Sequence, residues 1–283
     1  MKRIDLHVHS NVSDGTDTPA GLVTYALSKG LAAMALTDHD TVGGVVEALR
    51  AAEGTELRLI PGVELSAEYR GRDIHILGLF LNYGSEPLLA YLADVKETRN
   101  RRNERMAKLL SDHGMPVSME ELQSEFGGAV LTRAHFAKLL RKKGYVKSYD
   151  EAFERYLGDG KPCYLPKERI SPGQAIALIH RAGGLAMLAH PLLYHMEPEG
   201  IRELVRLLCG EGLDGLEAIY SMNSGKDEQC MRKLAADFGL LVSGGSDYHG
   251  ATKPHIDLGT GRGDLYVPEE VLEKLEAAVA VNI

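Results

Sequence analysis

Two histidines one residue apart, His7 and His9, lie near the start of the chain in the stretch RIDLHVHSNVSDGT. The apolar run that contains them predicts a strand, and side chains at positions i and i+2 of a strand point to the same face. Both imidazoles are therefore expected to project together where the strand ends. Because Asp14 follows in the adjoining turn, we interpret this stretch as part of a metal site.

Other metal-type side chains close further predicted strands, in the stretches TDHD, PGVEL, LAHP and GGSDYHG. They are His39, Glu64, His190, Asp247 and His249. His75 differs, because it stands near the start of its apolar run. In barrels built from βα units the chemistry gathers at the carboxyl ends of the strands, so these residues are expected to meet at one mouth.

The candidate ligands comprise six histidines and three carboxylates: His7, His9, Asp14, His39, Glu64, His75, His190, Asp247 and His249. One ion cannot use all of them, since Zn²⁺ usually takes about four ligands. We therefore expect a cluster of two to three divalent ions, with a carboxylate bridging a pair. Imidazole and carboxylate ligands together suit Mn, Zn or Fe, and the sequence does not choose among them.

The elements that must position these residues alternate along the chain. Apolar runs predict strands over 4–8, 31–36, 57–65, 74–81, 185–189, 215–220 and 240–243. Helices are expected over 19–29, 44–53, 172–181, 198–209 and 268–280, with one more before the last strand. Strands that alternate with helices predict an α/β fold with a mainly parallel sheet. The glycines of GGSDYHG are expected to allow a close backbone approach beside the metals.

The alternation stops between residues 86 and 165, where several helical patterns follow one another with little strand signal. We interpret this segment as an inserted helical cap. The predicted domains are thus a barrel with the metal site, formed by 1–85 and 166–283, and the cap formed by 86–165.

The bulk composition fits a globular protein: 283 residues, 44% hydrophobic and 25% charged, with a formal net charge of −8. No apolar run approaches the roughly 20 residues of a membrane helix, so no membrane partner is expected. The acidic balance argues against binding duplex DNA. Three cysteines without paired spacing do not indicate a disulfide framework, and we expect a cytoplasmic protein of undetermined oligomeric state.

The stretches DLHVHS, SDGT, TDHD, PGVELS, HILGL, LAHP and GGSDYHG, in this order, resemble the polymerase and histidinol phosphatase (PHP) family. The helical segment with TRAHFA resembles the branch that contains 3′,5′-nucleoside bisphosphate phosphatases and 5′→3′ exoribonucleases. The resemblance implies a distorted seven-stranded (β/α) barrel with a trinuclear metal centre. It implies one ion on His7, His9, Glu64 and Asp247, a second on Glu64, His75 and His190, and a third on Asp14, His39 and His249.

A metal cluster of this kind predicts hydrolysis of a phosphate monoester. Three divalent ions would outweigh three carboxylates and make the pocket positive inside an acidic protein. In two-metal phosphoester hydrolysis a bridging hydroxide attacks phosphorus in line. Glu64, Asp247 and Asp14 are the candidate catalytic residues, and the hydroxide is expected between the ions that share Glu64. Asp38 and Asp40 flank His39, and at most one of them is expected to face the metals, where it would orient a ligand rather than bind an ion.

Substrate contacts are expected from the inserted segment. Arg133 follows Thr132, a predicted helix N-cap, and both a helix N-terminus and an arginine bind phosphate; the alternative is a solvated surface arginine. His135 could contact the same phosphate or only pack against its neighbours. Lys161 is a candidate second phosphate contact, although a solvated lysine is the ordinary case.

The first functional hypothesis is hydrolysis of the 3′-phosphate of nucleoside 3′,5′-bisphosphates. The close alternative is 5′→3′ exonuclease action on a short oligoribonucleotide. Hydrolysis of histidinol phosphate is a weaker alternative, because the inserted helical segment points to the other branch. An amidohydrolase also begins with His-x-His, but it would normally supply a bridging lysine where this chain has Glu64. A non-catalytic, metal-stabilised interaction module is the third class, and the intact ligand set argues against it.

Overall fold

The computed structural model describes residues 2–127, 131–166 and 170–281. The chain divides into two compact units, which we treat separately. Unit 1 comprises Met1–Ala90 and Arg169–Ile283, and unit 2 comprises Tyr91–Glu168.

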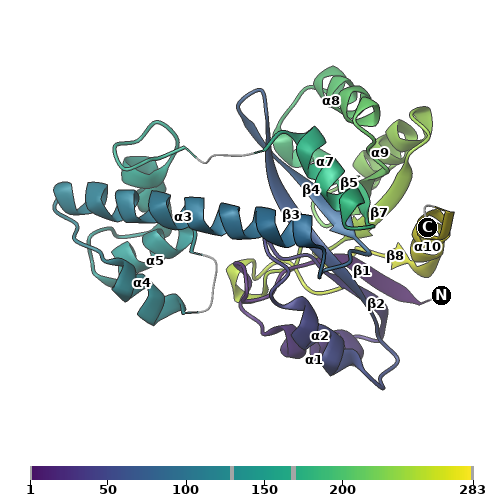
Figure 1. Cartoon of the computed structure of the whole chain (residues 1–283), viewed down its shortest axis with the longest axis horizontal. Helices are drawn as coiled ribbons and strands as arrows, with labels where there is room; N and C mark the ends of the chain where they lie inside the picture. The colour runs from purple at the N-terminus through teal and green to yellow at the C-terminus, as the bar shows by residue number, and fades with distance from the viewer. Residues whose placement is uncertain (1, 128–130, 167–169, 282–283) are drawn as a thin grey trace. The chain divides into compact units, whose positions relative to one another are not determined.

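Unit 1 is built on one sheet with the strand order β7-β6-β5-β4-β3-β2-β1-β8 (Figure 1). The strands are β1 (Arg3–Val8), β2 (Leu31–Leu36), β3 (Arg58–Tyr69), β4 (Arg72–Leu79), β5 (Leu185–Leu188), β6 (Gly215–Tyr220), β7 (Leu241–Gly245) and β8 (Val267–Pro268). The expected barrel is confirmed, but the sheet has eight described strands instead of seven. The additional strand is the two-residue β8, which pairs antiparallel with β1 and is too short to produce a periodic signal.

The sheet is mainly parallel, with a reversal at β4. Strands β1, β2 and β3 pair in parallel, as do β5, β6 and β7. Strand β4 is antiparallel to both of its neighbours, β3 and β5. The two ends of the sheet approach each other, because Val8 forms a parallel bridge with Tyr248 and Asp247 N donates to His7 O at 2.8 Å.

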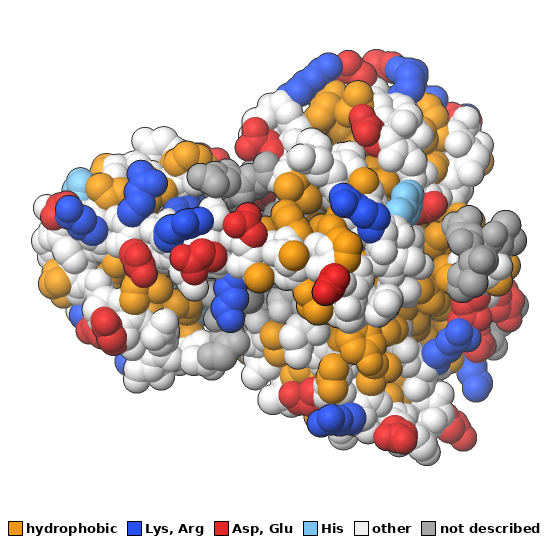
Figure 2. Space-filling view, in the orientation of Figure 1, with side chains coloured by type: hydrophobic (Ala, Val, Ile, Leu, Met, Phe, Trp, Pro, Cys, Tyr) orange, Lys and Arg blue, Asp and Glu red, His pale blue; other side chains and the backbone are white. Residues whose placement is uncertain are grey.

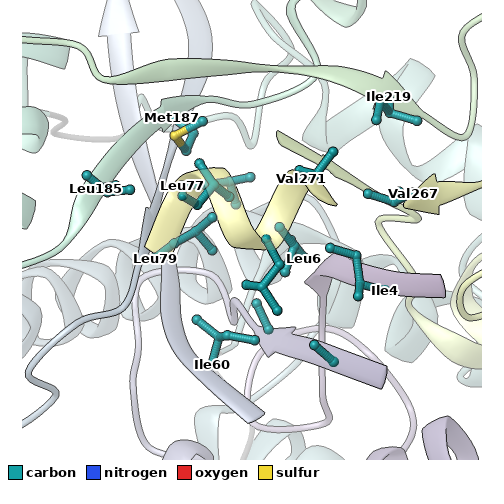
Figure 3. Packing of buried hydrophobic residues seen from close by; sticks show 14 of the residues in the cluster. Ile4, Leu6, Ile60, Leu77, Leu79, Leu185, Met187, Ile219, Val267 and Val271 are labelled. Carbon is teal, nitrogen blue, oxygen red and sulfur yellow. The ribbon is translucent and has the colours of Figure 1, made fainter. Parts of the chain in front are cut away.

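A large apolar cluster of unit 1 lies between the sheet and the C-terminal helix. Figure 3 shows side chains of β1, β3, β4, β5 and β6 meeting beside the C-terminal helix α10 (Glu269–Val281). Leu6, Leu77 and Met187 are each at most 1% exposed, and Val271 and Leu275 of α10 belong to the same cluster. Burial of these large aliphatic side chains stabilises the sheet on which the strand ends depend.

The other helices of unit 1 lie on the outside of the sheet (Figure 1). They are α1 (Pro19–Ser28), α2 (Val45–Ala52), α7 (Pro172–Arg181), α8 (Pro198–Gly210) and α9 (Gly225–Asp237). Thr18 caps α1 by accepting from Gly21 N, and Pro19 occupies the first turn, where its missing N–H is not needed. Ser171 and Ser224 begin α7 and α9 with capping boxes.

Unit 2 is helical, as the sequence predicts for the inserted segment. Its helices are α4 (Met119–Phe126), α5 (Arg133–Lys142), α6 (Tyr149–Ala152) and the π-helical turn η1 (Phe153–Leu157), while the long α3 (Glu86–Asp112) begins within unit 1. Phe136, Leu140 and Leu110 are fully buried in a separate apolar cluster. Among the described residues, no helix has both the length and the apolar character needed to cross a membrane.

Candidate metal centre

The nine candidate ligands meet at one edge of the unit 1 sheet. His7 and His9 come from the end of β1, His39 follows β2, His190 follows β5, and the Asp247–His249 pair follows β7. Parallel strands bring their carboxyl ends to the same edge. His75 stands near the start of its strand, but β4 runs in the opposite direction, so its beginning lies at the edge where the parallel strands end.

Glu64 is the centre of this arrangement. It is fully buried on β3, and five imidazoles surround its two oxygens. Oε1 lies 2.9 Å from His75 Nδ1 and 3.0 Å from His190 Nε2. Oε2 lies 3.0 Å from His39 Nδ1, 3.2 Å from His9 Nε2 and 3.4 Å from His7 Nε2. A carboxylate with ligand atoms on both oxygens has the arrangement needed to bridge two ions.

Asp14 and Asp247 complete the cluster on either side of His249. Asp14 Oδ1 lies 3.3 Å from His249 Nε2, and its Oδ2 lies 3.9 Å from His39 Nε2. Asp247 Oδ1 lies 3.3 Å from His249 Nδ1 and 3.5 Å from His9 Nε2. Asp14 therefore faces the histidines, with only 27% of its side chain exposed.

The ligand atoms form four overlapping groups, within each of which all atoms lie within 4.8 Å of one another. The groups are His9, Asp14, His39 and His249; His7, Glu64 and His190; His7, His9 and Asp247; and His39, Glu64 and His75. Their overlap fits a cluster of ions that share ligands. The division of the residues among particular ions stays a prediction.

The electrostatics of the cluster keep its carboxylates ionised. Burial raises the pKa of Glu64, but the surrounding imidazoles lower it by more, so the pKa lies well below its usual range. Burial also raises the pKa of Asp14, and His39 and His249 reverse this effect. Burial lowers the pKa of His75, whereas the nearby carboxylates raise it to about 10. The carboxylate oxygens are thus available to cations.

Several buried ligand atoms lack the hydrogen bonds that buried polar atoms normally make. Within the described part of the chain, His9 Nδ1, His39 Nδ1, His190 Nδ1 and Glu64 Oε2 have no hydrogen-bond partner. His39 Nδ1 lies 3.0 Å from Glu64 Oε2 without forming a hydrogen bond to it. His7 Nε2 and His9 Nε2 face each other at 3.1 Å. A buried polar atom without a partner is costly, and bound divalent cations would give these imidazole nitrogens and carboxylate oxygens partners. The cluster therefore fits divalent cations.

Glu217 supports the centre and was not among the residues singled out from the sequence. This fully buried side chain on β6 lies with Oε1 3.0 Å from His7 Nδ1, and its Oε2 accepts from His190 N at 2.8 Å. A carboxylate on one ring nitrogen fixes the tautomer that presents the other nitrogen to a metal. The available signal was an acidic residue inside the apolar strand GLEAIY, since a buried glutamate needs a partner.

Two further residues hold Asp247. Tyr220 Oη donates to Asp247 Oδ2 at 2.8 Å, and Lys253 Nζ donates to the same oxygen at 2.7 Å. Burial raises the pKa of Asp247, but the charges of His7 and Lys253 outweigh it and hold this pKa well below its usual range. Neither Tyr220 nor Lys253 was expected from the sequence.

Asp38 and Asp40 brace the loops that carry the candidate ligands. Asp38 accepts from Ser10 N at 2.7 Å and from Ser13 Oγ at 2.6 Å, which ties the segment between His9 and Asp14 to the end of β2. Asp40 accepts from Ser66 N at 2.9 Å. Neither carboxylate belongs to the four ligand groups.

The backbone at the centre departs from ordinary geometry. Asp40, His190 and Asp247 have positive φ values of 49°, 26° and 57°, which L-residues adopt at a cost of order 1–3 kcal/mol. At Gly245 a Cβ atom would lie 2.5 Å from His7 Cβ, so only glycine lets β7 approach β1 this closely. The close approach expected for GGSDYHG is therefore present.

The candidate substrate contacts all belong to unit 2. Arg133 is the first residue of α5 and donates to Asp159 Oδ1 at 2.8 Å, with its guanidinium 5.2 Å from the centre of the Tyr164 ring. His135 is buried and its Nδ1 accepts from Thr132 N at 3.0 Å, which gives it a capping role. Lys161 is exposed. The phosphate-binding roles of these three residues stay predictions.

Comparisons with known proteins agree with these features. The family model of the PHP domain matches residues 5–159. The chain is 38% identical over 248 residues to a 5′-3′ exoribonuclease of Haemophilus influenzae, covering 88% of this chain and 90% of that protein. It is 34% identical over 260 residues to a 3′,5′-nucleoside bisphosphate phosphatase of Chromobacterium violaceum, covering 92% and 91%.

A solved structure has a similar fold along nearly the whole chain. It comes from Bifidobacterium adolescentis and is named as a metal-dependent phosphoesterase. The TM-score is 0.83 and the sequence identity 29%, and the match covers 98% of this chain and 96% of that chain.

Proposed function

This chain belongs to the PHP family of metal-dependent phosphoesterases, and we propose that it removes the 3′-phosphate of nucleoside 3′,5′-bisphosphates. The observation that carries the proposal is the convergence of six histidines and three carboxylates, among them the buried Glu64. A relative of similar length named as a 3′,5′-nucleoside bisphosphate phosphatase supports the choice of substrate.

The nine candidate ligands would hold two to three divalent ions, and Glu64, with imidazoles near both of its oxygens, would contribute to more than one of them. Bound divalent ions would acidify a water molecule and neutralise charge on the phosphate oxygens. The protein residues prepare this site. Glu217 orients His7, Tyr220 and Lys253 restrain Asp247, and Asp38 anchors the segment that carries Asp14.

Recognition of the rest of the substrate is assigned to unit 2. Residues 91–168 contain 15 Lys and Arg against 12 Asp and Glu, a formal net charge of +3, whereas the remaining residues, with 17 against 28, have a net charge of −11. Figure 2 shows Lys and Arg side chains over α3 on the face in view, interspersed with acidic ones. A positive unit suits a substrate that carries two anionic phosphate groups. Arg133 is proposed to bind one phosphate, held in place by Asp159.

The second candidate function is 5′→3′ exonuclease action on a short oligoribonucleotide. A relative named as a 5′-3′ exoribonuclease supports it, as does the basic stretch KETRNRRNERMAK within α3. If this stretch binds the RNA backbone, oligonucleotide hydrolysis should weaken steeply as salt rises, because phosphate contacts release counterions. Hydrolysis of the small bisphosphate should change much less over the same salt range.

A comparison of three substrates tests the proposal. We would measure kcat/KM in parallel for a nucleoside 3′,5′-bisphosphate, a 5′-monophosphorylated oligoribonucleotide and histidinol phosphate, with Mn²⁺ present. The proposal expects the bisphosphate to have the highest value. A higher value for the oligoribonucleotide would make exonuclease action the main function, and a preference for histidinol phosphate would contradict both readings.

A further inference from the structure

Asp247 presents its two carboxylate oxygens to different surroundings. Oδ1 faces the imidazoles, at 3.3 Å from His249 Nδ1 and 3.5 Å from His9 Nε2. Oδ2 accepts from Tyr220 Oη and Lys253 Nζ. One oxygen is therefore offered to an ion, while two protein donors bind the other.

The two donors differ in charge. Tyr220 contributes a neutral hydroxyl, and burial together with the neighbouring carboxylates keeps its pKa far above the physiological range. Lys253 contributes a charged ammonium group, and the lysine side chain is 39% exposed. A hydroxyl can orient the carboxylate, whereas the ammonium also neutralises part of its charge.

The backbone of Lys253 is held at this position by the loop that carries Asp14. The 3₁₀ turn η3 (Gly250–Thr252) ends at Lys253, whose N–H donates to Gly250 O at 3.1 Å. Within the turn, Ala251 N donates to Thr16 Oγ1 at 2.9 Å and Thr252 Oγ1 donates to Asp14 O at 3.2 Å. The backbone from which the Lys253 side chain reaches Asp247 is thus fixed by contacts with the segment that carries Asp14.

We propose that Lys253 is a positioning residue that sets, through its charge, how tightly the centre holds the divalent ion on Asp247. This inference rests on the proposed metal centre. The ammonium repels a nearby cation and withdraws charge from Asp247, so the ion is bound less tightly. An ion that receives less charge from its protein ligand keeps more charge for the oxygens of a substrate phosphate.

The test compares variants that remove one donor from the same oxygen. Lys253→Met removes the donor and its charge, and Tyr220→Phe removes a donor without changing the charge. Lys253→Arg keeps the charge. Lys29→Met serves as a matched control, because Lys29 pairs with Asp257 at 2.5 Å through a similarly partly exposed contact outside the centre. Equilibrium dialysis against free Mn²⁺ gives the number of ions bound by each protein as the Mn²⁺ concentration rises. The binding step that disappears in Asp247→Ala is the one that belongs to the ion on Asp247.

The expected result is a shift of that step in Lys253→Met to about tenfold lower Mn²⁺, the exposure of the lysine limiting the size of the effect. Lys253→Arg and Lys29→Met should bind as the wild type does, and Tyr220→Phe should bind equally or more weakly. Equal or weaker binding by Lys253→Met would overturn the inference, because an orienting donor would then explain the contact. If Lys253→Met does not fold by circular dichroism, Lys253→Gln replaces it.

Failure of the proposed function gives a different result. A wild-type protein that binds no Mn²⁺ at any concentration would overturn the metal centre, and the inference about Lys253 with it. A wild-type protein that shows the Asp247-dependent step, with Lys253→Met unshifted, would overturn the inference alone.

Discussion

Glu217 Oε1 lies 3.0 Å from Nδ1 of His7, and neither side chain is exposed to solvent. The contact joins β6 to β1 across the sheet and leaves Nε2 of His7 directed at the other imidazoles. The same carboxylate also holds the backbone of His190, so one glutamate positions candidate ligands from two strands. The geometry of the centre therefore depends on a residue that is not itself in the ligand groups.

The first prediction concerns this support. Glu217→Gln keeps the size of the side chain but leaves only one acceptor oxygen. That oxygen cannot serve both His7 Nδ1 and His190 N, which contact separate oxygens of the glutamate. Loss of a partner behind a ligating histidine costs about 10–100-fold in metal affinity, and we expect that loss in Mn²⁺ titrations. Glu203→Gln, which changes an exposed glutamate on α8, is the control. Wild-type affinity in Glu217→Gln would contradict the role assigned to Glu217.

Asp14→Asn tests the ion assigned to Asp14, His39 and His249. The amide keeps the shape of the side chain but loses the anionic charge, so the metal content per chain should fall by about one ion, as measured by elemental analysis. Asp17→Asn is the control, because Asp17 accepts from Tyr248 Oη and belongs to none of the ligand groups. An unchanged metal content in Asp14→Asn would place Asp14 outside the centre.

Arg133→Lys tests substrate recognition by unit 2. Lysine keeps the charge but loses the planar fork that binds phosphate through two nitrogens, so KM for the bisphosphate should rise about tenfold. The metal content should stay the same. Arg155→Lys, an exposed change in the same unit, should leave KM unchanged. Equal KM values for the two variants would remove Arg133 from the substrate contacts.

The pair of His180 and Asp214 predicts a pH dependence of stability. His180 Nε2 lies 2.7 Å from Asp214 Oδ2, and this hydrogen bond raises the pKa of His180 above 6.5. The stabilisation is therefore complete below the unfolded pKa and is lost as the pH rises through the folded pKa. Because the imidazole is partly exposed and solvent screens the interaction, the pair should add only about 0.5 kcal/mol to the free energy of unfolding when His180 is protonated.

Urea unfolding of wild type and His180→Asn across the pH range checks this prediction. The difference between the two proteins should be largest below about pH 6 and should shrink at alkaline pH. His255→Asn, at an exposed histidine, controls for the substitution itself. A difference that grows with pH would show that the sign of the effect is wrong.

Much of the centre was predictable because its residues follow apolar runs. An apolar run that ends in His, Asp or Glu marks both a strand and the edge at which its chemistry lies, and this placed His39, His190 and Asp247 correctly at the strand ends. The direction of a strand within the sheet does not show in its sequence. The antiparallel pairing of β4 with β3, which explains why His75 belongs to the centre although it stands at the start of its strand, was therefore not predictable.

The supporting residues were harder to predict. Glu217 left a signal, since an acidic residue inside an apolar strand requires a buried partner, but the sequence does not say which partner. Lys253 left none. It belongs to a loop, and its contact with Asp247 depends on a 3₁₀ turn anchored to Thr16, more than 200 residues away in the sequence. Long-range loop packing of this kind has no periodic pattern.

The metal content and activity of Glu64→Ala test the central claim most directly. The purified variant would be loaded with Mn²⁺, freed of excess ions, and assayed by elemental analysis and by phosphate release from a nucleoside 3′,5′-bisphosphate. Glu68→Ala, at an exposed position on the same strand, is the control. We expect Glu64→Ala to retain fewer ions than the wild type and to release no phosphate. A variant with full metal content and full activity would contradict the account.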